Sequence, residues 1–234
     1  MTDWEVVRAQ YYGWFLSVPD SRLLLERARE VVEQCLSQAG ESSRVQLYRR
    51  DNIASGEKCH CTAQFVRKAD NHPMELERLG EVSRLIIAGF IITPRTLGAR
   101  VVLSQSQLEL YKQNDLELFS VAAEAKPRSH QSDLSPPDLD RTEAASLEEA
   151  QCSGLDLIGD MKGRRAHITL GCVGPVRPVQ TGLDQLEVLR RLEKCEDLDT
   201  AAIQAGTVLS LGEGCWVVAL TSPLSVATVF TGSY

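Results

Sequence analysis

The chain has 234 residues, of which 43% are hydrophobic and 24% are charged, and its formal net charge is −7. This length is sufficient to bury a sizeable core in one large domain or in two lobes folded as a unit. An acidic chain has no overall attraction to phosphate backbones or anionic membranes, so contact with a nucleotide requires a local site. The seven cysteines show no C-x-x-C spacing, which is typical of reduced thiols in a cytoplasmic protein.

The N-terminal region predicts a strand and then a helix. Residues 11–16, YYGWFL, are aromatic and β-prone, and Pro19-Asp20-Ser21 is a turn and helix-start signal. A helix is expected to follow and to stop at Gly40. Its apolar face is formed by residues at helical spacing, namely Leu24, Ala28, Val31, Cys35 and Ala39.

The next β-prone segment, KCHCTAQFV, holds His60 two residues before Thr62. On a strand these two side chains project from the same face. Cys59 and Cys61 flank the histidine but would point to the other face, so the three residues are not expected to share a metal ion.

The middle of the chain predicts an antiparallel hairpin and then a loop. The apolar run 85–92 and the run 99–103 are separated by residues 94–98, which is the right length for a hairpin connection. Residues 108–118 are ambiguous between strand and loop. Residues 123–163 are rich in Ser, Pro, Asp and Glu and predict a disordered acidic loop.

A second segment, RAHITLGCV, repeats the H-x-T spacing with His167 and Thr169. After it, Thr181 and Asp184 form a T-x-x-D signal that predicts the start of a helix. The expected buried stripe of this helix is Leu183, Leu186, Leu189 and Leu192. Three further β-prone runs, at 206–211, 215–221 and 225–231, end the chain at the pace of an antiparallel sheet.

Each half of the chain thus offers helices and strands around one H-x-T strand. We expect an α+β fold of two lobes, with antiparallel sheets flanked by helices and both motifs meeting in the cleft between the lobes. One H-x-T match alone is better explained as an ordinary strand histidine with a satisfied hydrogen bond. The pair favours function. The remaining histidines, His72 and His130, lie in polar contexts and are expected to be solvated.

Two imidazoles across a phosphate can divide the work of a general base and a general acid, because both forms of histidine are available near neutral pH. One takes a proton from water and the other gives a proton to the departing oxygen. The threonine hydroxyls can bind the non-bridging oxygens as negative charge builds. A cyclic phosphodiester suits such a site, since it needs only one ring-opening step and no metal.

Several segments, in the same order along nearly the whole chain, resemble the two-histidine (2H) phosphoesterases. In detail they resemble the catalytic domains of the 2′,3′-cyclic-nucleotide 3′-phosphodiesterases. The fish regeneration-induced members are the expected close relatives. The segments that carry the resemblance are YYGWFL at 11–16, HCTAQF at 60–65, ITPRTLGARVVLS at 92–104, RAHITLGC at 165–172, PVQTGLD at 178–184 and VFTGSY at 229–234.

The resemblance implies that residues 1–234 form one catalytic domain that hydrolyses nucleoside 2′,3′-cyclic phosphates to 2′-phosphates without a metal or other cofactor. It implies that His60 protonates the leaving 3′ oxygen and His167 activates water, while Thr62 and Thr169 bind phosphate oxygens. The spacing of the residues does not itself decide which histidine is the acid and which is the base.

Neighbouring residues in the matched segments are further candidates for binding the substrate. Arg165 lies on the same strand face as His167 and would steady the phosphate or a catalytic water, although an exposed arginine at a strand end explains it equally well. Pro178 and Val179 would offer an apolar surface to the base, and the helix start at Thr181 would offer N–H groups to the anion. Phe65 and Tyr11 would shape the base pocket, or else belong to the core.

Two departures from the family bear on partners and location. The chain has no G-x-x-x-x-G-K-[ST] loop, so no nucleotide kinase activity is expected. It ends at Tyr234 without the C-terminal cysteine motif that receives a prenyl group, so membrane association is expected only of a longer form. The chain is expected to be a monomer. RNA ends are expected as further partners, and the resemblance also implies cytoskeletal proteins. The alternative to an enzyme is therefore a module that binds RNA ends or cytoskeleton, with incidental catalysis.

Overall fold

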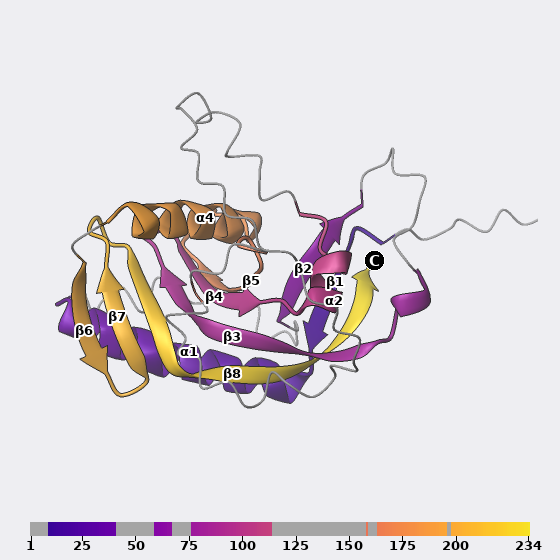
Figure 1. Cartoon of the computed structure of the whole chain (residues 1–234), viewed down its shortest axis with the longest axis horizontal. Helices are drawn as coiled ribbons and strands as arrows, with labels where there is room; N and C mark the ends of the chain where they lie inside the picture. Colours follow the sequence, from indigo (N-terminus) through magenta and orange to yellow (C-terminus); the bar gives the residue numbers. More distant parts are fainter. Residues whose placement is uncertain (1–8, 41–58, 67–75, 114–157, 159–162, 196–197) are drawn as a thin grey trace, which may run out of the picture.

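The described strands of the chain pair into one antiparallel sheet, which Figure 1 shows with its helices. The structure is a computed structural model, and it describes residues 9–40, 59–66, 76–113, 158, 163–195 and 198–234. The elements in chain order are β1 (Tyr11–Leu16), α1 (Val18–Gln38), β2 (His60–Phe65), a 3₁₀ turn (Leu76–Arg78), β3 (Val82–Ile92), β4 (Thr96–Val102), α2 (Gln105–Leu110), β5 (His167–Cys172), α4 (Val179–Lys194), β6 (Asp199–Ile203), β7 (Gly206–Ser210) and β8 (Trp216–Ser233).

Six of the strands close into a barrel. The sheet order is β1-β2-β5-β4-β3-β8-β7-β6, and an additional pairing between β1 and β8 closes the ring, so that β7 and β6 extend it beyond β8. The prediction of an α+β fold with antiparallel strands is confirmed. Two separate lobes are not seen among the described residues: β2 and β5, the two H-x-T strands, are hydrogen-bonded neighbours in the same sheet.

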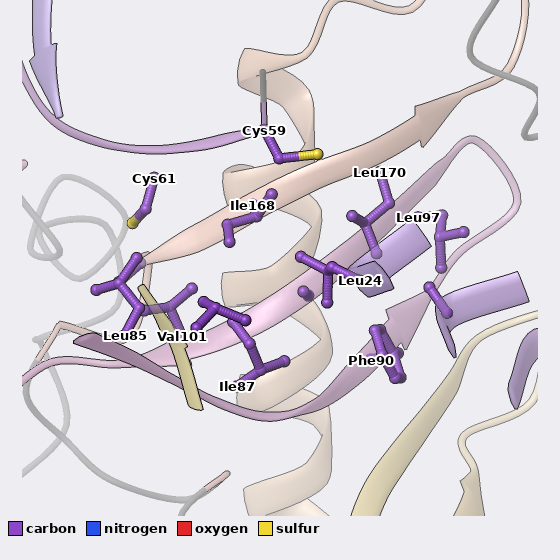
Figure 2. Close-up of a cluster of buried hydrophobic side chains, with 14 of the residues drawn as sticks. Leu24, Cys59, Cys61, Leu85, Ile87, Phe90, Leu97, Val101, Ile168 and Leu170 are labelled. Carbon is purple, nitrogen blue, oxygen red and sulfur yellow. The ribbon is translucent and has the colours of Figure 1, made fainter. Parts of the chain in front are cut away.

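Alternation along the strands sends one set of side chains into a large core. The cluster includes Trp14 of β1, Phe90 of β3 and Phe230 of β8, all almost fully buried. Figure 2 shows Cys61 of β2 and Ile168 of β5 among the side chains of this cluster. Because successive strand residues face opposite sides, the residues flanking Cys61 and Ile168 face away from the core.

The helix α1 confirms most of the prediction made from its apolar spacing: four of the five predicted residues are buried, whereas Ala39 follows the helix and is exposed. Ser17 caps it by accepting a hydrogen bond from the backbone N–H of Asp20. The helix ends before Gly40, whose φ of 73° is the left-handed conformation that glycine adopts readily at a helix end. Its buried face joins the large core through Leu24, Ala28, Val31, Val32, Cys35 and Leu36.

The helix α4 covers another part of the sheet and packs on β4 and β5 (Figure 1). A second core cluster beneath it contains Val188 and Leu189. The predicted stripe is partly right, because Leu186 and Leu189 are buried whereas Leu183 and Leu192 are only half-buried. The buried face of α4 instead includes the polar or small residues Thr181, Gly182, Asp184 and Gln185.

The β3–β4 hairpin is confirmed, with its turn at residues 93–95. The last two predicted runs form the single strand β8, which contains Pro223. Opposite β3 the pairing jumps from Ile87↔Leu224 to Gly89↔Ala219, and proline is tolerated at such an irregularity because no ladder hydrogen bond is needed there. The strand β6 was not predicted.

The ambiguous segment 108–118 begins inside a helix, since α2 runs from Gln105 to Leu110 with Ser104 and Gln107 forming a capping box. Most of the predicted acidic loop at 123–163 lies outside the described residues. Within the part of the chain that the structure describes, no helix combines the length and the apolar character needed to cross a lipid bilayer.

Candidate active site

The two H-x-T segments lie side by side on the barrel. Cys61 of β2 pairs with Ile168 of β5 in antiparallel register, which sets His60 opposite Thr169 and Thr62 opposite His167. Since Cys61 and Ile168 point into the core, both histidines and both threonines share the other face of the sheet. The four side chains therefore meet, as predicted, but on adjacent strands and not across two lobes.

These side chains line a pocket of about 360 Å³, which is within the usual size range of small-ligand sites. Its described lining consists of Tyr11, His60, Thr62, Phe65, Gln113, Arg165, His167, Thr169, Arg177, Pro178 and Val179. Two of these residues are arginines, and none of the described lining residues is acidic. The pocket thus suits an anion, although the whole chain is negatively charged.

Among the predicted site residues, Thr181 is the exception, because it does not line the pocket. The helix α4 begins two residues earlier, at Val179, and the backbone N–H of Thr181 is already bonded to the carbonyl oxygen of Pro178 at 3.0 Å. Its side chain is buried against β4, where its methyl group lies close to Gly98. Thr181 therefore packs the helix onto the sheet and has no N–H to offer to an anion.

Gln113 and Arg177 line the pocket but were not predicted. Gln113 follows α2 in the chain, and its side chain donates to the carbonyl oxygen of Thr62 at 2.6 Å, which links this segment to β2. Arg177 is exposed and directly precedes Pro178. The adjacency of Arg177 to Pro178 and Val179 was a usable signal in the sequence, whereas no local pattern pointed to Gln113.

His167 is held in a defined orientation. Its Nδ1 lies 2.7 Å from the carbonyl oxygen of Arg165, an acceptor, so in the neutral ring Nδ1 carries the proton and Nε2 keeps its lone pair. Burial is the main cause that lowers the pKa of His167 to about 4, and the positive charges of Arg165 and Arg100 and the nearby His60 add to it. The imidazole is therefore neutral at pH 7.

His60 has a different, aromatic environment. Its ring stacks on Tyr11 and on Phe15, with ring centroids 5.0 Å apart in each pair. Phe65 meets Tyr11 edge-on at 6.0 Å. Between Tyr11 and Phe15, Gly13 lies where a Cβ would collide with the backbone of Cys61, so the missing side chain lets β1 approach β2 closely.

Phe65 and Val179 contribute exposed apolar surface to the pocket, with 46% and 42% of each residue accessible. Phe65 ends β2 and Val179 begins α4. Exposed apolar side chains on a pocket wall suit the face of a planar ring. The pocket thus combines polar groups that suit an anion with apolar groups that suit an aromatic base.

The cysteines beside His60 lie away from this pocket. Cys59 and Cys61 are both buried, and burial raises the pKa of the Cys61 thiol to about 12. In the portion of the chain that the structure describes, no group of three or more His, Cys, Asp or Glu side chains is arranged to hold a metal ion.

Comparison with known proteins finds one matching family model and several similar proteins. Residues 121–234 match the model of the family described as 2′,3′-cyclic nucleotide 3′-phosphodiesterase (CNP or CNPase). Proteins named 2′,3′-cyclic-nucleotide 3′-phosphodiesterase, a hydrolase activity, are 27% identical in Mus musculus and 28% identical in Rattus norvegicus, each over 250 residues. A protein of that name from Pongo abelii is 28% identical over 247 residues.

The alignments cover 96% of this chain and 50% of each of these relatives. The chain thus spans about half the length of the curated relatives it matches. Residues 121–234 thus match the CNPase family model, and over most of its length the chain is similar to proteins named 2′,3′-cyclic-nucleotide 3′-phosphodiesterase.

Proposed function

We propose that this chain hydrolyses nucleoside 2′,3′-cyclic phosphates to nucleoside 2′-phosphates by acid and base catalysis between two histidines. The observation that carries the proposal is the placement of both H-x-T pairs on neighbouring strands, where all four side chains line one pocket. The similarity to proteins named 2′,3′-cyclic-nucleotide 3′-phosphodiesterase supports the same substrate class.

His167 acts as the general base. Its low pKa leaves it neutral at pH 7, and the hydrogen bond from Nδ1 to the carbonyl oxygen of Arg165 leaves Nε2 to accept a proton. Nε2 takes a proton from water, and the oxygen of that water attacks the phosphorus. His60 acts as the general acid: as the bond between phosphorus and O3′ breaks, it gives its proton to O3′, so the phosphate remains on O2′.

The remaining pocket residues bind the substrate. The hydroxyls of Thr62 and Thr169 donate hydrogen bonds to the non-bridging oxygens while charge builds on them. In the structure, the Thr169 hydroxyl donates to the carbonyl oxygen of Pro178 at 3.2 Å, so it exchanges that partner for the phosphate when substrate binds. Arg165 adds a positive charge beside the phosphate.

The nucleobase rests on the apolar side of the pocket. Phe65 and Tyr11 form one wall through their edge-on contact, and Pro178 with Val179 forms the border at the start of α4. RNA ends that carry a terminal 2′,3′-cyclic phosphate present the same reacting group, so they fall within the proposed substrate class.

The test is turnover of 2′,3′-cyclic AMP in the presence of a metal chelator, measured for the wild type, His60→Ala and His167→Ala. Each substitution is expected to lower kcat by about two to four powers of ten. His130→Ala is the matched control, and it should retain wild-type activity. Unchanged turnover in either active-site variant would overturn the two-histidine mechanism, and loss of wild-type activity on chelation would point to a metal-dependent one. Binding without turnover would favour the alternative of a binding module.

A further inference from the structure

Gly182 occupies an unexpected place in α4. It lies on the buried face, one turn after the helix begins at Val179. Glycine is a much poorer helix former than alanine. Its φ is not among the positive values of the described chain, so conformational freedom does not explain it. Since this glycine weakens the helix and is not needed for a turn, we look for its explanation in close packing.

The packing partner is the ring of His167. A Cβ on Gly182 would lie 2.7 Å from Cε1 and 3.0 Å from Nδ1 of His167, and 3.1 Å from Cγ of Arg165. Real carbon contacts are about 3.5–4.0 Å. The imidazole thus packs directly on the backbone of α4, in space that any other residue at position 182 would fill.

The same helix fixes the carbonyl group that orients the ring. Gln185, one turn from Gly182 on the buried face, donates from Nε2 to the carbonyl oxygens of Arg164 at 2.6 Å and Ala166 at 3.0 Å. These residues flank Arg165, whose carbonyl oxygen lies 2.7 Å from Nδ1 of His167. The helix therefore supports the imidazole by direct contact and through its hydrogen-bond partner.

The start of α4 is itself anchored to the β3–β4 turn. Asp184 accepts hydrogen bonds from Arg95 Nη2 at 2.7 Å and from Thr96 Oγ1 at 2.8 Å. At Gly98, a Cβ would lie 2.6 Å from the methyl group of Thr181, so the helix also sits tightly on β4. The surface of α4 against which His167 packs is consequently held in place.

We propose that Gly182 is a positioning residue: by lacking a side chain, it lets α4 hold the imidazole of His167 so that Nε2 is directed to the pocket and the ring is shielded from water. This inference rests on the proposed function for its kinetic consequence, whereas the contact itself can be tested without turnover. Gly182 does not line the pocket, so it acts through His167 and not on the substrate.

The test replaces Gly182 by alanine and follows the protonation of His167 by the NMR titration of its Cε1 proton, assigned with His167→Gln. The added methyl group should push the ring toward solvent and raise its titration midpoint from about 4 toward 6.5. The charged or titratable groups facing the ring are His60 on β2, Arg100 on β4 and Arg165 before β5. The substitution replaces none of them, although the added methyl group also approaches Cγ of Arg165. The control, Glu187→Ala, changes a half-exposed side chain of the same helix, and it should leave the midpoint unchanged.

The kinetic readout separates positioning from binding. In Gly182→Ala, kcat for 2′,3′-cyclic AMP should fall at least ten-fold, while KM stays within about three-fold of the wild type, because no residue that lines the pocket is replaced and the displacement is confined to His167 and the neighbouring Arg165. The acid limb of the pH profile should move upward together with the NMR midpoint. If the midpoint moves but neither the wild type nor any variant turns over substrate, the positioning role of Gly182 stands and the proposed function fails.

Asp184→Asn provides a second variant if Gly182→Ala does not fold. It loosens the start of α4 without adding atoms near His167. Loss of a negative charge would by itself lower the pKa of a histidine, so a raised midpoint in this variant reports weaker packing. An unchanged or lowered midpoint in the folded Gly182→Ala protein, or in Asp184→Asn when only that variant folds, would overturn the proposal.

Discussion

Replacing Asp184 by alanine is expected to lower the free energy of unfolding by about 3 kcal/mol. Its carboxylate is 7% exposed and accepts hydrogen bonds from Thr96, Gln180 and Arg95. Thr96 is almost fully buried, so losing its charged acceptor costs about 2 kcal/mol. Arg95 is 55% exposed, so water can replace much of the hydrogen bonding that Arg95 and Gln180 lose when the carboxylate is removed. Loss of their hydrogen bonds therefore adds only about 1 kcal/mol to the cost.

The assay is urea unfolding at pH 7, with Glu187→Ala as a control on the same helix. Glu187 pairs with Arg190, and both are about half exposed, so its loss should cost no more than about 0.5 kcal/mol. Burial by itself would raise the pKa of Asp184, but hydrogen bonds from Arg95, Gln180 and Thr96 hold it below 3.8. The difference between wild type and Asp184→Ala should therefore persist above pH 4 and shrink as the pH falls through that lowered value. Equal costs for Asp184→Ala and Glu187→Ala would refute the reasoning.

Two further predictions concern the pocket. Because burial lowers the pKa of His167 from 6.5 to about 4, the unfolded chain binds that proton first, and stability should fall by up to about 3 kcal/mol as the pH drops from 6.5 to 4. Urea unfolding of His167→Gln should lack this component, and an identical pH dependence in both proteins would contradict it. Thr62→Ala and Thr169→Ala should each lower kcat by about one to three powers of ten, whereas Thr62→Ser and Thr169→Ser, which keep the hydroxyl, should retain most activity. Equal losses in the alanine and serine variants would count against a role for the hydroxyls.

The face on which the site lies was predictable from the sequence, but the pairing of its strands was not. A period of two residues placed His60 with Thr62, and His167 with Thr169, opposite the buried Cys61 and Ile168. Periodicity within a segment contains no information on which distant strand lies beside it. The two motifs were therefore expected in separate lobes, whereas β2 and β5 are neighbours in one sheet.

The T-x-x-D pattern at Thr181 was misread for a related reason. It has the spacing of a helix cap, but the helix starts earlier, with Pro178 at its N-cap, because proline is well suited to the beginning of a helix. Asp184 instead reaches the β3–β4 turn, a partner almost ninety residues away that local spacing does not reveal. Gln113 was missed because it follows α2, in a segment where the sequence did not decide between strand and loop.

The antiparallel register of β2 and β5 relates the two H-x-T pairs by an approximate local two-fold axis, which passes through the Cys61 and Ile168 pair. A half-turn about this axis exchanges His60 with His167 and Thr62 with Thr169, so a cyclic phosphate turned end for end would meet the same four groups. In the proposed mechanism, the H-x-T pairs alone would therefore not set the direction of ring opening. That direction would be set by what breaks the symmetry, namely the aromatic rings beside His60 and the bare backbone of α4 beside His167.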